Sequence, residues 1–261
     1  MNRPLSASQI STYLQCARKY RLRYVDACVP EFKSAALAFG SAMHSAIEWF
    51  HTEKIDGRTP ALDAVLRVFR ADWSSEQETG IRYDEDESAV QFESLGATLL
   101  DLYVARVGTE TIVASEVPFE VPLVDPETGE AYGVRLRGYF DALFGEPGAE
   151  TLVEVKTTAR RFTAADLRRK IQLAAYRYAF RQVRGRTPDV KVVALVKTKR
   201  PALDVQDVPE TLDEGVFVRL AVEVARGVEA GVFPANPGWA CDGCEYAVAC
   251  VGGVGSVAMA A

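Results

Sequence analysis

Hydrophobic residues recur at helical spacing through the first part of the chain. Ser6 and Gln9 have the spacing of a capping box, in which two side chains satisfy the first backbone N–H groups of a helix. The apolar positions that follow predict a helix from there to about Tyr24. The same spacing of three and four residues predicts three more helices, at about 38–51, 60–78 and 86–106.

The hydrophobic pattern changes at about residue 112. Segments rich in Val, Phe and Tyr, separated by turn residues, predict strands at 112–123, 131–144 and 151–157. A helix at about 164–184, an apolar strand at 190–196 and a helix at about 211–230 follow. We therefore predict an α/β fold, with a mixed sheet flanked by helices and a helical N-terminal part.

The composition is that of an ordinary globular protein. Of 261 residues, 48% are hydrophobic and 25% are charged, which excludes collagen-like, disordered and coiled-coil proteins. We predict a single domain over 1–251, with a mainly helical part at 1–110, the sheet and its helix at 111–200, and a helix with a cysteine cluster at 201–251. Residues 252–261 are small, and we expect a flexible tail there.

The chain shows no signal for a membrane. No apolar run approaches the roughly 18 residues that a membrane span needs. The first residues lead directly into a polar, amphipathic segment, without the features of a signal peptide. We therefore expect a cytoplasmic protein.

Positive charge is concentrated in a chain that is acidic overall. The net charge is −6, yet residues 154–200 hold 14 Lys and Arg against 3 Asp and Glu. A second basic cluster lies near the N-terminus, at Arg18, Lys19, Arg21 and Arg23. This distribution indicates either a site for a polyanion or merely solvated basic helix faces, and composition does not separate the two.

Two acidic residues and a lysine are predicted to meet on neighbouring strands. In the predicted strand at 151–157, Glu154 and Lys156 point to one face, while Val153 and Val155 point to the other. The turn at 145–148 would bring the preceding strand back antiparallel, which places Asp141 next to Glu154.

Carboxylates held this close repel each other unless a cation lies between them. Oxygen ligands favour Mg²⁺ or Mn²⁺, and Lys156 beside them could orient a water molecule or stabilise charge during phosphodiester cleavage. A surface ion pair between Glu154 and Lys156 on an edge strand is the simpler alternative.

The helix that follows this strand carries polar residues at helical spacing. Gln172 and Tyr176 lie four residues apart, hence on one face, directly after the basic run Arg168, Arg169 and Lys170. They could bond a DNA phosphate or hold the lysine and water in place. A tyrosine packed on the sheet, with a solvated glutamine, is the alternative.

Histidine and cysteine counts narrow the possible metal sites. Only two histidines are present, which excludes a zinc site built on several histidines. Cysteines in the pattern C-x₂-C-x₅-C, at Cys241, Cys244 and Cys250, lack a fourth ligand, for which Cys16 is the candidate. Four thiolates suit zinc or an iron–sulfur cluster, and buried reduced thiols are the alternative.

The motifs together resemble a known family. Asp141 in Gly-Tyr-Phe-Asp, then Glu154-Val155-Lys156, then Gln172-x₃-Tyr176 resemble the PD-(D/E)xK nuclease superfamily in its RecB-type branch. His44 matches the helix-borne histidine of that branch. The resemblance implies a restriction-endonuclease-like fold. It implies metal coordination by His44, Asp141, Glu154 and the Val155 carbonyl, with Lys156 as the catalytic lysine. Glu116 is a candidate for a further acidic contributor.

The cysteine pattern is similar to that of iron–sulfur nucleases, including the CRISPR-adaptation nuclease family and the AddB subunit nuclease. This similarity implies a 4Fe–4S cluster rather than zinc and leaves Cys28 outside the site. By cross-link analogy, the cluster would join the first helix to the C-terminal segment and stabilise the fold by roughly 5 kcal/mol.

These features predict a Mg²⁺- or Mn²⁺-dependent DNA nuclease. The resemblance favours an exonuclease acting on single-stranded DNA or DNA ends in recombination, repair or CRISPR adaptation, with a helicase or integrase as partner. The basic residues named above, near the N-terminus and at 168–170, would contact DNA phosphates. Two alternatives remain: a catalytically silent DNA-binding scaffold of a helicase–nuclease or integration complex, and a zinc-stapled structural protein.

Overall fold

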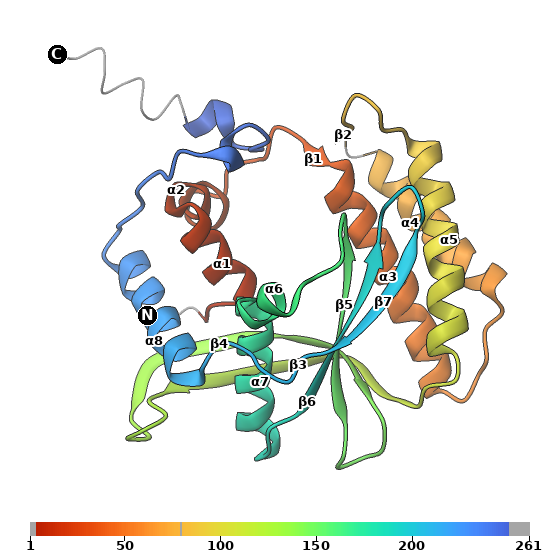
Figure 1. Ribbon diagram of the computed structural model, residues 1–261. Helices are drawn as coiled ribbons and strands as arrows, with labels where there is room; N and C mark the ends of the chain where they lie inside the picture. The colour runs from red at the N-terminus through yellow and green to blue at the C-terminus, as the bar shows by residue number, and fades with distance from the viewer. Residues whose placement is uncertain (1–3, 79, 251–261) are drawn as a thin grey trace. The chain divides into compact units, whose positions relative to one another are not determined.

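The computed structural model describes residues 4–78 and 80–250 (Figure 1). The chain divides into two compact units. The larger, the sheet–helix unit, holds residues 33–119 and 139–212. The smaller, the terminal unit, holds the described residues of 1–32, 120–138 and 213–261. The predicted tail at 252–261 lies outside the described residues.

A five-stranded mixed sheet confirms the predicted α/β class. Its strands are β3 (Ile112–Val124), β4 (Ala131–Phe144), β5 (Thr151–Thr158), β6 (Asp189–Val196) and β7 (Ala202–Asp207). They lie in the order β3-β4-β5-β6-β7, with β5 and β6 parallel and the pairs β4/β5 and β6/β7 antiparallel. Sequence analysis missed β7.

The predicted hairpin between β4 and β5 is confirmed. Ala142 pairs with Val153, and Phe144 pairs with Thr151. Gly145, at φ 109°, opens the turn in a backbone conformation that only glycine adopts readily. This register continues toward Asp141 and Glu154, so local turn geometry brings the two carboxylates to neighbouring positions.

The connection from β5 to β6 differs from the prediction of one helix at 164–184. It contains α6 (Ala164–Arg168) and α7 (Ile171–Arg184), separated by Arg169 and Lys170. Thr163 and Asp166 form a capping box that begins α6, and Lys170 adopts an extended backbone that ends the helical path. The helix that carries Gln172 and Tyr176 therefore starts only at Ile171.

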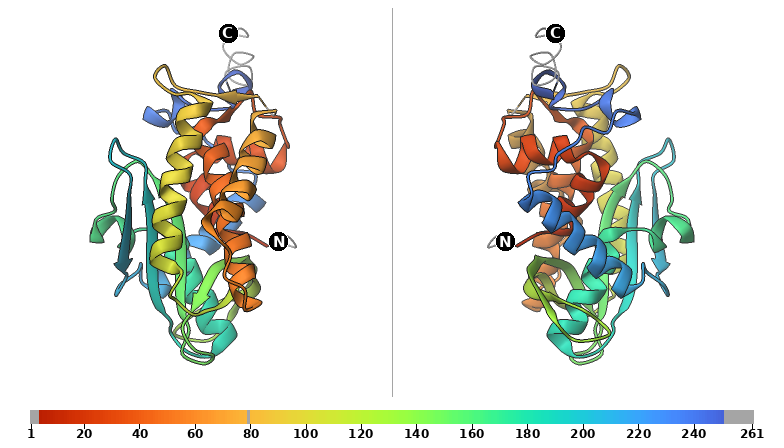
Figure 2. Two further views of the ribbon diagram at one scale, coloured as in Figure 1. Left: turned by 90° about the vertical axis from the view of Figure 1, so that its right-hand side faces the viewer. Right: turned by 90° about the vertical axis from the view of Figure 1, so that its left-hand side faces the viewer.

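Three helices form a layer on one face of the sheet, and the one drawn in yellow in Figure 2 lies directly beside the strands. They are α3 (Ala35–Ile55), α4 (Leu62–Gln77) and α5 (Ala89–Val107). A pair of two-residue parallel strands, β1 (Lys33–Ser34) and β2 (Ile81–Arg82), lies before α3 and after α4. Val153 and Val155 pack in the core beneath these helices with Phe39, Phe69 and Trp73, which confirms that the two valines are core residues.

Aromatic packing fastens α7 to the sheet. The ring of Tyr176 meets the rings of Phe119 and Phe140 edge-on, at centroid distances of 5.9 and 5.7 Å. Phe180, one turn further along, lies against Phe140. This packing, among largely buried side chains, sets the position of the Tyr176 hydroxyl.

The terminal unit begins with the predicted capping box. Ser6 accepts a hydrogen bond from the Gln9 backbone, and the Gln9 side chain accepts one from the Ser6 backbone. The predicted continuous helix to Tyr24 is wrong. It is divided into α1 (Ala7–Gln15), α2 (Ala17–Tyr20) and a π-helical turn (Arg21–Val25). The first break is at Cys16, whose φ of −161° and ψ of 108° are extended.

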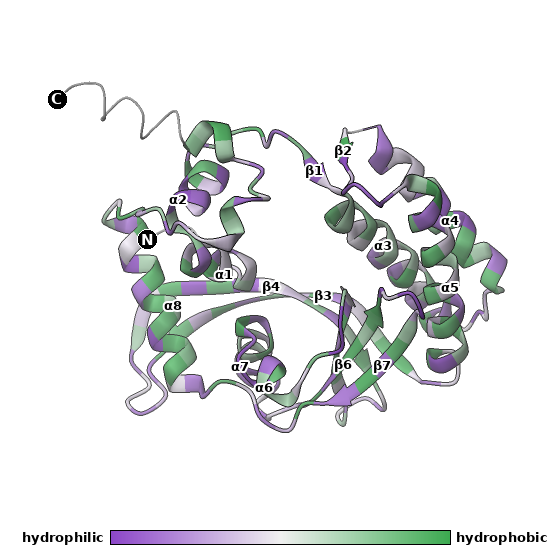
Figure 3. Ribbon diagram, turned by 45° about the horizontal axis from the view of Figure 1, so that its top comes forward, coloured by the Kyte–Doolittle hydropathy of each residue, from purple (hydrophilic) through white to green (hydrophobic). Residues whose placement is uncertain are grey.

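The C-terminal segment lies along these helices within the same unit. Helix α8 (Glu214–Glu229) carries both hydrophobic and hydrophilic residues, as Figure 3 shows, buries Phe217, Val218 and Ala221, and packs on α1. After α8, Tyr13 donates a hydrogen bond to the Val232 carbonyl at 2.6 Å, and Asn236 donates one to the Gln15 carbonyl at 2.9 Å. A short 3₁₀ turn (Trp239–Cys241) follows. Hydrogen bonds therefore join α1 to the segment that follows α8.

Candidate active site

Asp141, Glu154 and Lys156 come together at the junction of β4 and β5. Asp141 Oδ2 accepts a hydrogen bond of 3.0 Å from the backbone N–H of Val155. Lys156 Nζ lies 2.5 Å from Glu154 Oε1. The Asp141 carboxylate is close enough to Glu154 to disfavour ionisation of Glu154. The strand register and this hydrogen bond together create the cluster that the sequence predicted.

Burial makes the Glu154 carboxylate costly to ionise. The residue is 1% exposed, and neither of its oxygens accepts a hydrogen bond of good geometry from the described residues. Burial raises the pKa of Glu154 above its ordinary value, Lys156 opposes this shift, and Asp141 adds to it. The site therefore holds a buried carboxylate with unsatisfied acceptor capacity, which a cation would satisfy.

The ammonium group of Lys156 is kept charged by its neighbours. Burial alone would lower the pKa of Lys156, but the carboxylates of Glu154 and Asp141 outweigh burial and raise it. Lys156 is thus a fixed positive charge at this end of β5 rather than a base.

His44 faces the same cluster from α3. Burial lowers the pKa of His44, Asp141 and the Val155 carbonyl oppose that shift, and Lys156 adds to it. The imidazole is therefore neutral near pH 7, the form in which histidine binds metals. The predicted ligands thus lie within electrostatic reach of one another.

Glu116 approaches the cluster through an unusual backbone conformation. Its φ is 48°, in the left-handed region, where a residue other than glycine costs about 1–3 kcal/mol. Burial raises the pKa of Glu116 to about 7, and the charges of Asp141 and Glu48 add to this effect. The strained residue is therefore one of the acidic group around Asp141.

Gln172 and Tyr176 reach the site as the sequence predicted. Gln172 Nε2 donates to the Tyr176 hydroxyl at 2.9 Å, and that hydroxyl donates to Asp141 Oδ1 at 3.5 Å. Burial raises the pKa of Tyr176, and the carboxylates of Glu154 and Asp141 add to the shift. The phenol therefore remains a hydrogen-bond donor toward Asp141.

The donor chemistry of this cluster fits a divalent cation. Two carboxylates, a neutral imidazole and a backbone carbonyl are hard or borderline ligands suited to Mg²⁺ or Mn²⁺, and positive charge would relieve the repulsion between Asp141 and Glu154. Among residues 4–78 and 80–250, however, no three His, Cys, Asp or Glu side chains converge in a group that could hold a metal ion. Glu154 is paired with Lys156 instead.

Comparison with known families decides the classification. A family model described as the PD-(D/E)XK nuclease superfamily matches residues 4–251. The chain belongs to this superfamily.

One solved structure supports the fold of this superfamily member. A protein from Eubacterium rectale, provisionally named an exonuclease, matches with a TM-score of 0.58 and 16% identity, over 94% of this chain and 87% of that one. A second structure, SSO0001, has 18% identity over 89% of this chain and 92% of its own, but its TM-score of 0.39 is too low to carry an argument. No curated protein matches the chain.

Sequence analysis overlooked several residues around this superfamily site. Glu48 follows His44 by one helical turn, and its charge acts on both His44 and Glu116. The spacing of four residues on one helix could have indicated it. Ser115, which donates to the Asp141 backbone carbonyl, and its neighbour His51 gave no signal in the sequence pattern.

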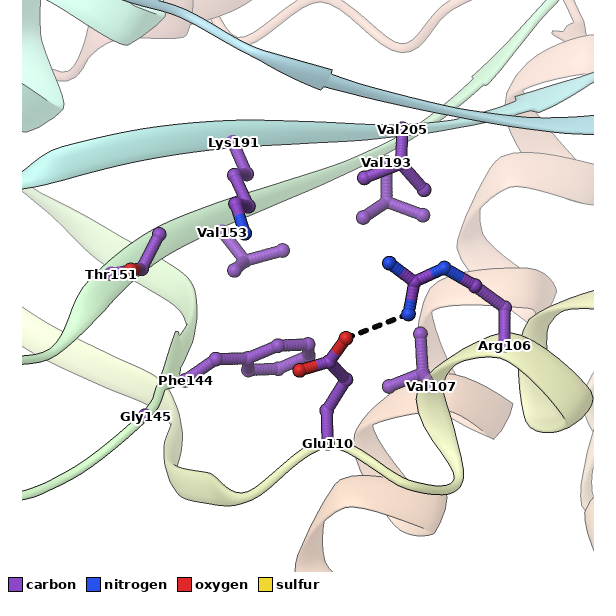
Figure 4. Close-up of a pocket in the computed structure, with 10 residues that line it drawn as sticks. All are labelled: Arg106, Val107, Glu110, Phe144, Gly145, Thr151, Val153, Lys191, Val193 and Val205. Atoms are coloured by element: carbon purple, nitrogen blue, oxygen red, sulfur yellow. Dashed lines mark hydrogen bonds and ion pairs between the residues drawn. The ribbon is translucent and has the colours of Figure 1, made fainter.

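A pocket of about 210 Å³ lies apart from the cluster, toward the start of β5 (Figure 4). Val153, Val193 and Val205 form its apolar side, and the ion pair between Arg106 and Glu110 lies at its edge. Val153 points to the opposite face of β5 from Glu154, so the residues predicted for the active site do not line this pocket.

Two of the four basic residues predicted near the N-terminus form ion pairs within the protein. Lys19 pairs with Glu245 at 2.7 Å, and Arg21 pairs with Asp26 at 3.0 Å. The guanidinium of Arg23 lies over the Tyr24 ring, and Arg18 Nε is buried. Part of the predicted positive surface is therefore neutralised.

The basic run at 168–170 is divided in the same way. Arg168 pairs with Glu210 at 3.0 Å, and Lys170 lies over the Phe162 ring at 4.3 Å. Arg169 is exposed at the break between α6 and α7.

The four cysteines predicted as ligands, Cys16, Cys241, Cys244 and Cys250, all belong to the terminal unit. Burial raises the pKa of the Cys250 thiol, and Cys16, Cys244 and Cys241 add to the shift, which shows that these thiols lie within electrostatic reach. All are reduced. Their donor set suits zinc or an iron–sulfur cluster, although the described residues do not hold them in metal-binding geometry.

Membrane-spanning structure is not found in the described part of the chain, where each helix is too short or too polar to cross a bilayer.

Proposed function

We propose that this protein is a Mg²⁺- or Mn²⁺-dependent deoxyribonuclease that acts as an exonuclease on single-stranded DNA or on DNA ends. The observation that carries the proposal is the buried carboxylate of Glu154, which lies beside Asp141 and pairs with Lys156 at 2.5 Å. Membership of the PD-(D/E)XK nuclease superfamily supports the reaction class. The name of the Eubacterium rectale relative supports exonuclease action.

The proposed ligands are His44, Asp141, Glu154 and the Val155 carbonyl. A bound Mg²⁺ or Mn²⁺ ion would supply Lewis-acid stabilisation of the negative charge that develops on the phosphate. The hydrogen bond from the Val155 N–H directs Asp141 toward β5, and burial holds the imidazole of His44 neutral.

Lys156 is the proposed catalytic residue. During hydrolysis a water molecule gives up one proton to solvent as its oxygen bonds to phosphorus, the bond from phosphorus to the leaving sugar oxygen breaks, and that oxygen takes up a proton from solvent. The raised pKa of Lys156 keeps a positive charge where it can orient the water and stabilise the phosphate oxygens. Tyr176, supported by Gln172, positions Asp141 in the same reaction.

We also propose that Cys16, Cys241, Cys244 and Cys250 bind a 4Fe–4S cluster, with zinc as the alternative. Thiolate-only donor sets suit both. The effect of the other three thiols on the pKa of Cys250 supports the proposed ligand set. Its role would be structural, because the four cysteines belong to two distant parts of the chain.

The nuclease proposal is tested with end-labelled linear single-stranded DNA and with circular single-stranded DNA. With Mn²⁺ or Mg²⁺ we expect stepwise shortening of the linear strand and no cleavage of the circle, because the circle has no ends. Cutting of the circle would contradict exonuclease action, and loss of the linear strand in excess EDTA would contradict the metal requirement.

Two lysine variants distinguish a role of Lys156 in catalysis from the general effect of losing one positive charge. Lys156→Ala should lower the cleavage rate by about 100-fold or more, because it removes the fixed charge at the reacting phosphate. Lys191→Ala is the matched control, since Lys191 is a partly exposed lysine on the neighbouring strand β6. Equal activity in the two variants would overturn the role of Lys156. A parent protein that binds the strand but cleaves it with neither metal would favour the silent scaffold.

A further inference from the structure

A chain of three hydrogen bonds leads from the helical layer to the backbone of Asp141. Tyr103 on α5 contacts His51 on α3, with 2.7 Å between the hydroxyl and Nε2. His51 Nδ1 lies 3.1 Å from Ser115 Oγ on β3. The Ser115 hydroxyl donates to the Asp141 carbonyl on β4 at 3.1 Å. Four separate elements are thus joined at the residue proposed to bind the metal.

The chemistry of the groups sets the direction of every bond in this chain. The Asp141 carbonyl can only accept, so it takes the single hydroxyl hydrogen of Ser115. Ser115 Oγ must then accept from His51, which places a hydrogen on Nδ1. The other ring nitrogen, Nε2, is therefore the acceptor, and Tyr103 donates to it. The arrangement requires neutral His51 in its Nδ1–H tautomer.

Burial protects the hydrogen bond between His51 and Tyr103, while Ser115 is partly exposed. His51 is 1% exposed and Tyr103 is fully buried, so water does not compete for their hydrogen bonds. Burial lowers the pKa of His51 to about 3, and His44 and Lys54 add to this effect, so the ring is neutral near pH 7. Breaking one link would leave a buried donor or acceptor unpaired, at a cost of about 1–3 kcal/mol.

Asp141 is held from two sides as a result. Its carboxylate accepts from the Val155 N–H and from the Tyr176 hydroxyl, and its carbonyl accepts from Ser115. The carboxylate contacts restrain the side chain, whereas the Ser115 contact restrains the peptide plane from which the side chain projects. A metal ligand needs both restraints to keep a constant direction.

We propose that His51 and Ser115 are positioning residues for Asp141, with Tyr103 fixing the His51 tautomer. The proposal rests on the proposed metal-dependent function of Asp141. It assigns to the second histidine of the chain a role distinct from that of His44, since His51 contacts Ser115 and Tyr103 rather than the carboxylates.

Nitrogen NMR of the imidazole groups tests the tautomer without any substitution. The chain has only two histidines, so ¹⁵N-histidine labelling gives two sets of ring signals, and loss of one set in His51→Asn assigns it. We expect the Nδ1–H tautomer for His51 at neutral pH. The Nε2–H tautomer or a charged ring would overturn the proposal.

Calorimetric titration with MnCl₂ tests the effect on the metal site. Ser115→Ala should weaken Mn²⁺ binding by about tenfold or more, as is typical when a group that orients a ligand is removed. Ser115→Thr keeps the hydroxyl and should restore the affinity. At saturating Mn²⁺ the cleavage rate of Ser115→Ala should return toward that of the parent, because positioning acts through metal affinity.

The possible results separate this inference from the nuclease proposal. Equal Mn²⁺ affinity in Ser115→Ala and the parent would overturn the positioning role, even if both cleave DNA. Weaker Mn²⁺ binding in Ser115→Ala, with no cleavage by the parent, would support the positioning role and overturn the nuclease. Absence of Mn²⁺ binding in the parent would overturn both. If Ser115→Ala fails to fold, the tautomer measurement on the parent still decides.

Discussion

The backbone N–H of Val155 donates a 3.0 Å hydrogen bond to Asp141 Oδ2, where the register of β4 and β5 continues past its last pair. This bond ties the Asp141 side chain to the residue that follows Glu154. The two carboxylates are thereby held together despite their repulsion, which raises the pKa of Glu154. The fold accepts an unfavourable charge arrangement at this point, as proteins often do where a ligand will bind.

Asp141→Asn should separate stability from metal binding. The asparagine oxygen can still accept from the Val155 N–H, while the repulsion with Glu154 disappears. We expect an equal or higher melting temperature in EDTA, together with loss of the stabilisation by Mn²⁺. For a protein that binds Mn²⁺, that stabilisation is about 2.7 kcal/mol at a metal concentration 100 times Kd. An Mn²⁺-induced shift as large as that of the parent would contradict a ligand role.

Gly96 permits the close approach of α4 and α5. A Cβ atom there would lie 2.2 Å from Cζ of the fully buried Phe69 ring. We expect Gly96→Ala to lower the free energy of unfolding by about 1–3 kcal/mol through overpacking, despite the better helix propensity of alanine. Denaturant unfolding measures the change. Adding Phe69→Leu should make the alanine less costly, and a purely additive double variant would contradict the steric explanation.

His51 should make the protein sensitive to acid. Its pKa is about 3 in the folded state, against about 6.5 when unfolded, so between these values the unfolded chain binds the extra proton. Stability should therefore fall as the pH drops below about 6.5, by up to 1.4 kcal/mol per pH unit. His44 acts in the same direction. In His51→Asn the slope of stability against pH should be smaller by about one proton, and an unchanged slope would refute this account.

Cys241→Ala should lower thermal stability, DNA binding and iron content together. The contacts of Tyr13 with Val232 and of Asn236 with Gln15 already fasten the chain ends, so the loss should be smaller than the roughly 5 kcal/mol of a cross-link alone. Cys28→Ala, which changes a cysteine outside the proposed set, is the control. A colourless parent protein that contains zinc would contradict the iron–sulfur cluster. An unchanged melting temperature in Cys241→Ala would contradict a structural role for the cluster.

The central part of the site could be predicted because it depends on local geometry. Alternation along β5 places Glu154 and Lys156 on one face, and the turn at 145–148 sets the register that brings Asp141 beside them. Gln172 and Tyr176 share a helix face for the same local reason. These relationships span few residues and follow from the periods of strand and helix.

The local sequence pattern did not predict where the helices end. Cys16 lies in a helical pattern, yet it is extended, while Arg18, two residues later, donates its backbone N–H to the Pro234 carbonyl, more than 200 residues away in the sequence. A contact of that kind takes a backbone N–H out of the series of hydrogen bonds within the helix, and the local sequence gives no sign of it. The break at Lys170 is likewise a property of the β5–β6 crossover rather than of helix propensity.

The sequence by itself determined the strands that carry the carboxylates and the register that brings Asp141 beside Glu154, because a period of two and a tight turn dictate these, and its motifs resembled the family to which the chain belongs. Only the tertiary structure decided that His51, Ser115 and Tyr103 form a directed chain to Asp141, and that Glu116 adopts a left-handed backbone beside it. Those groups come from α3, α5, β3 and β4, and hydrogen bonds between separate elements form only once packing has excluded water and fixed their distances.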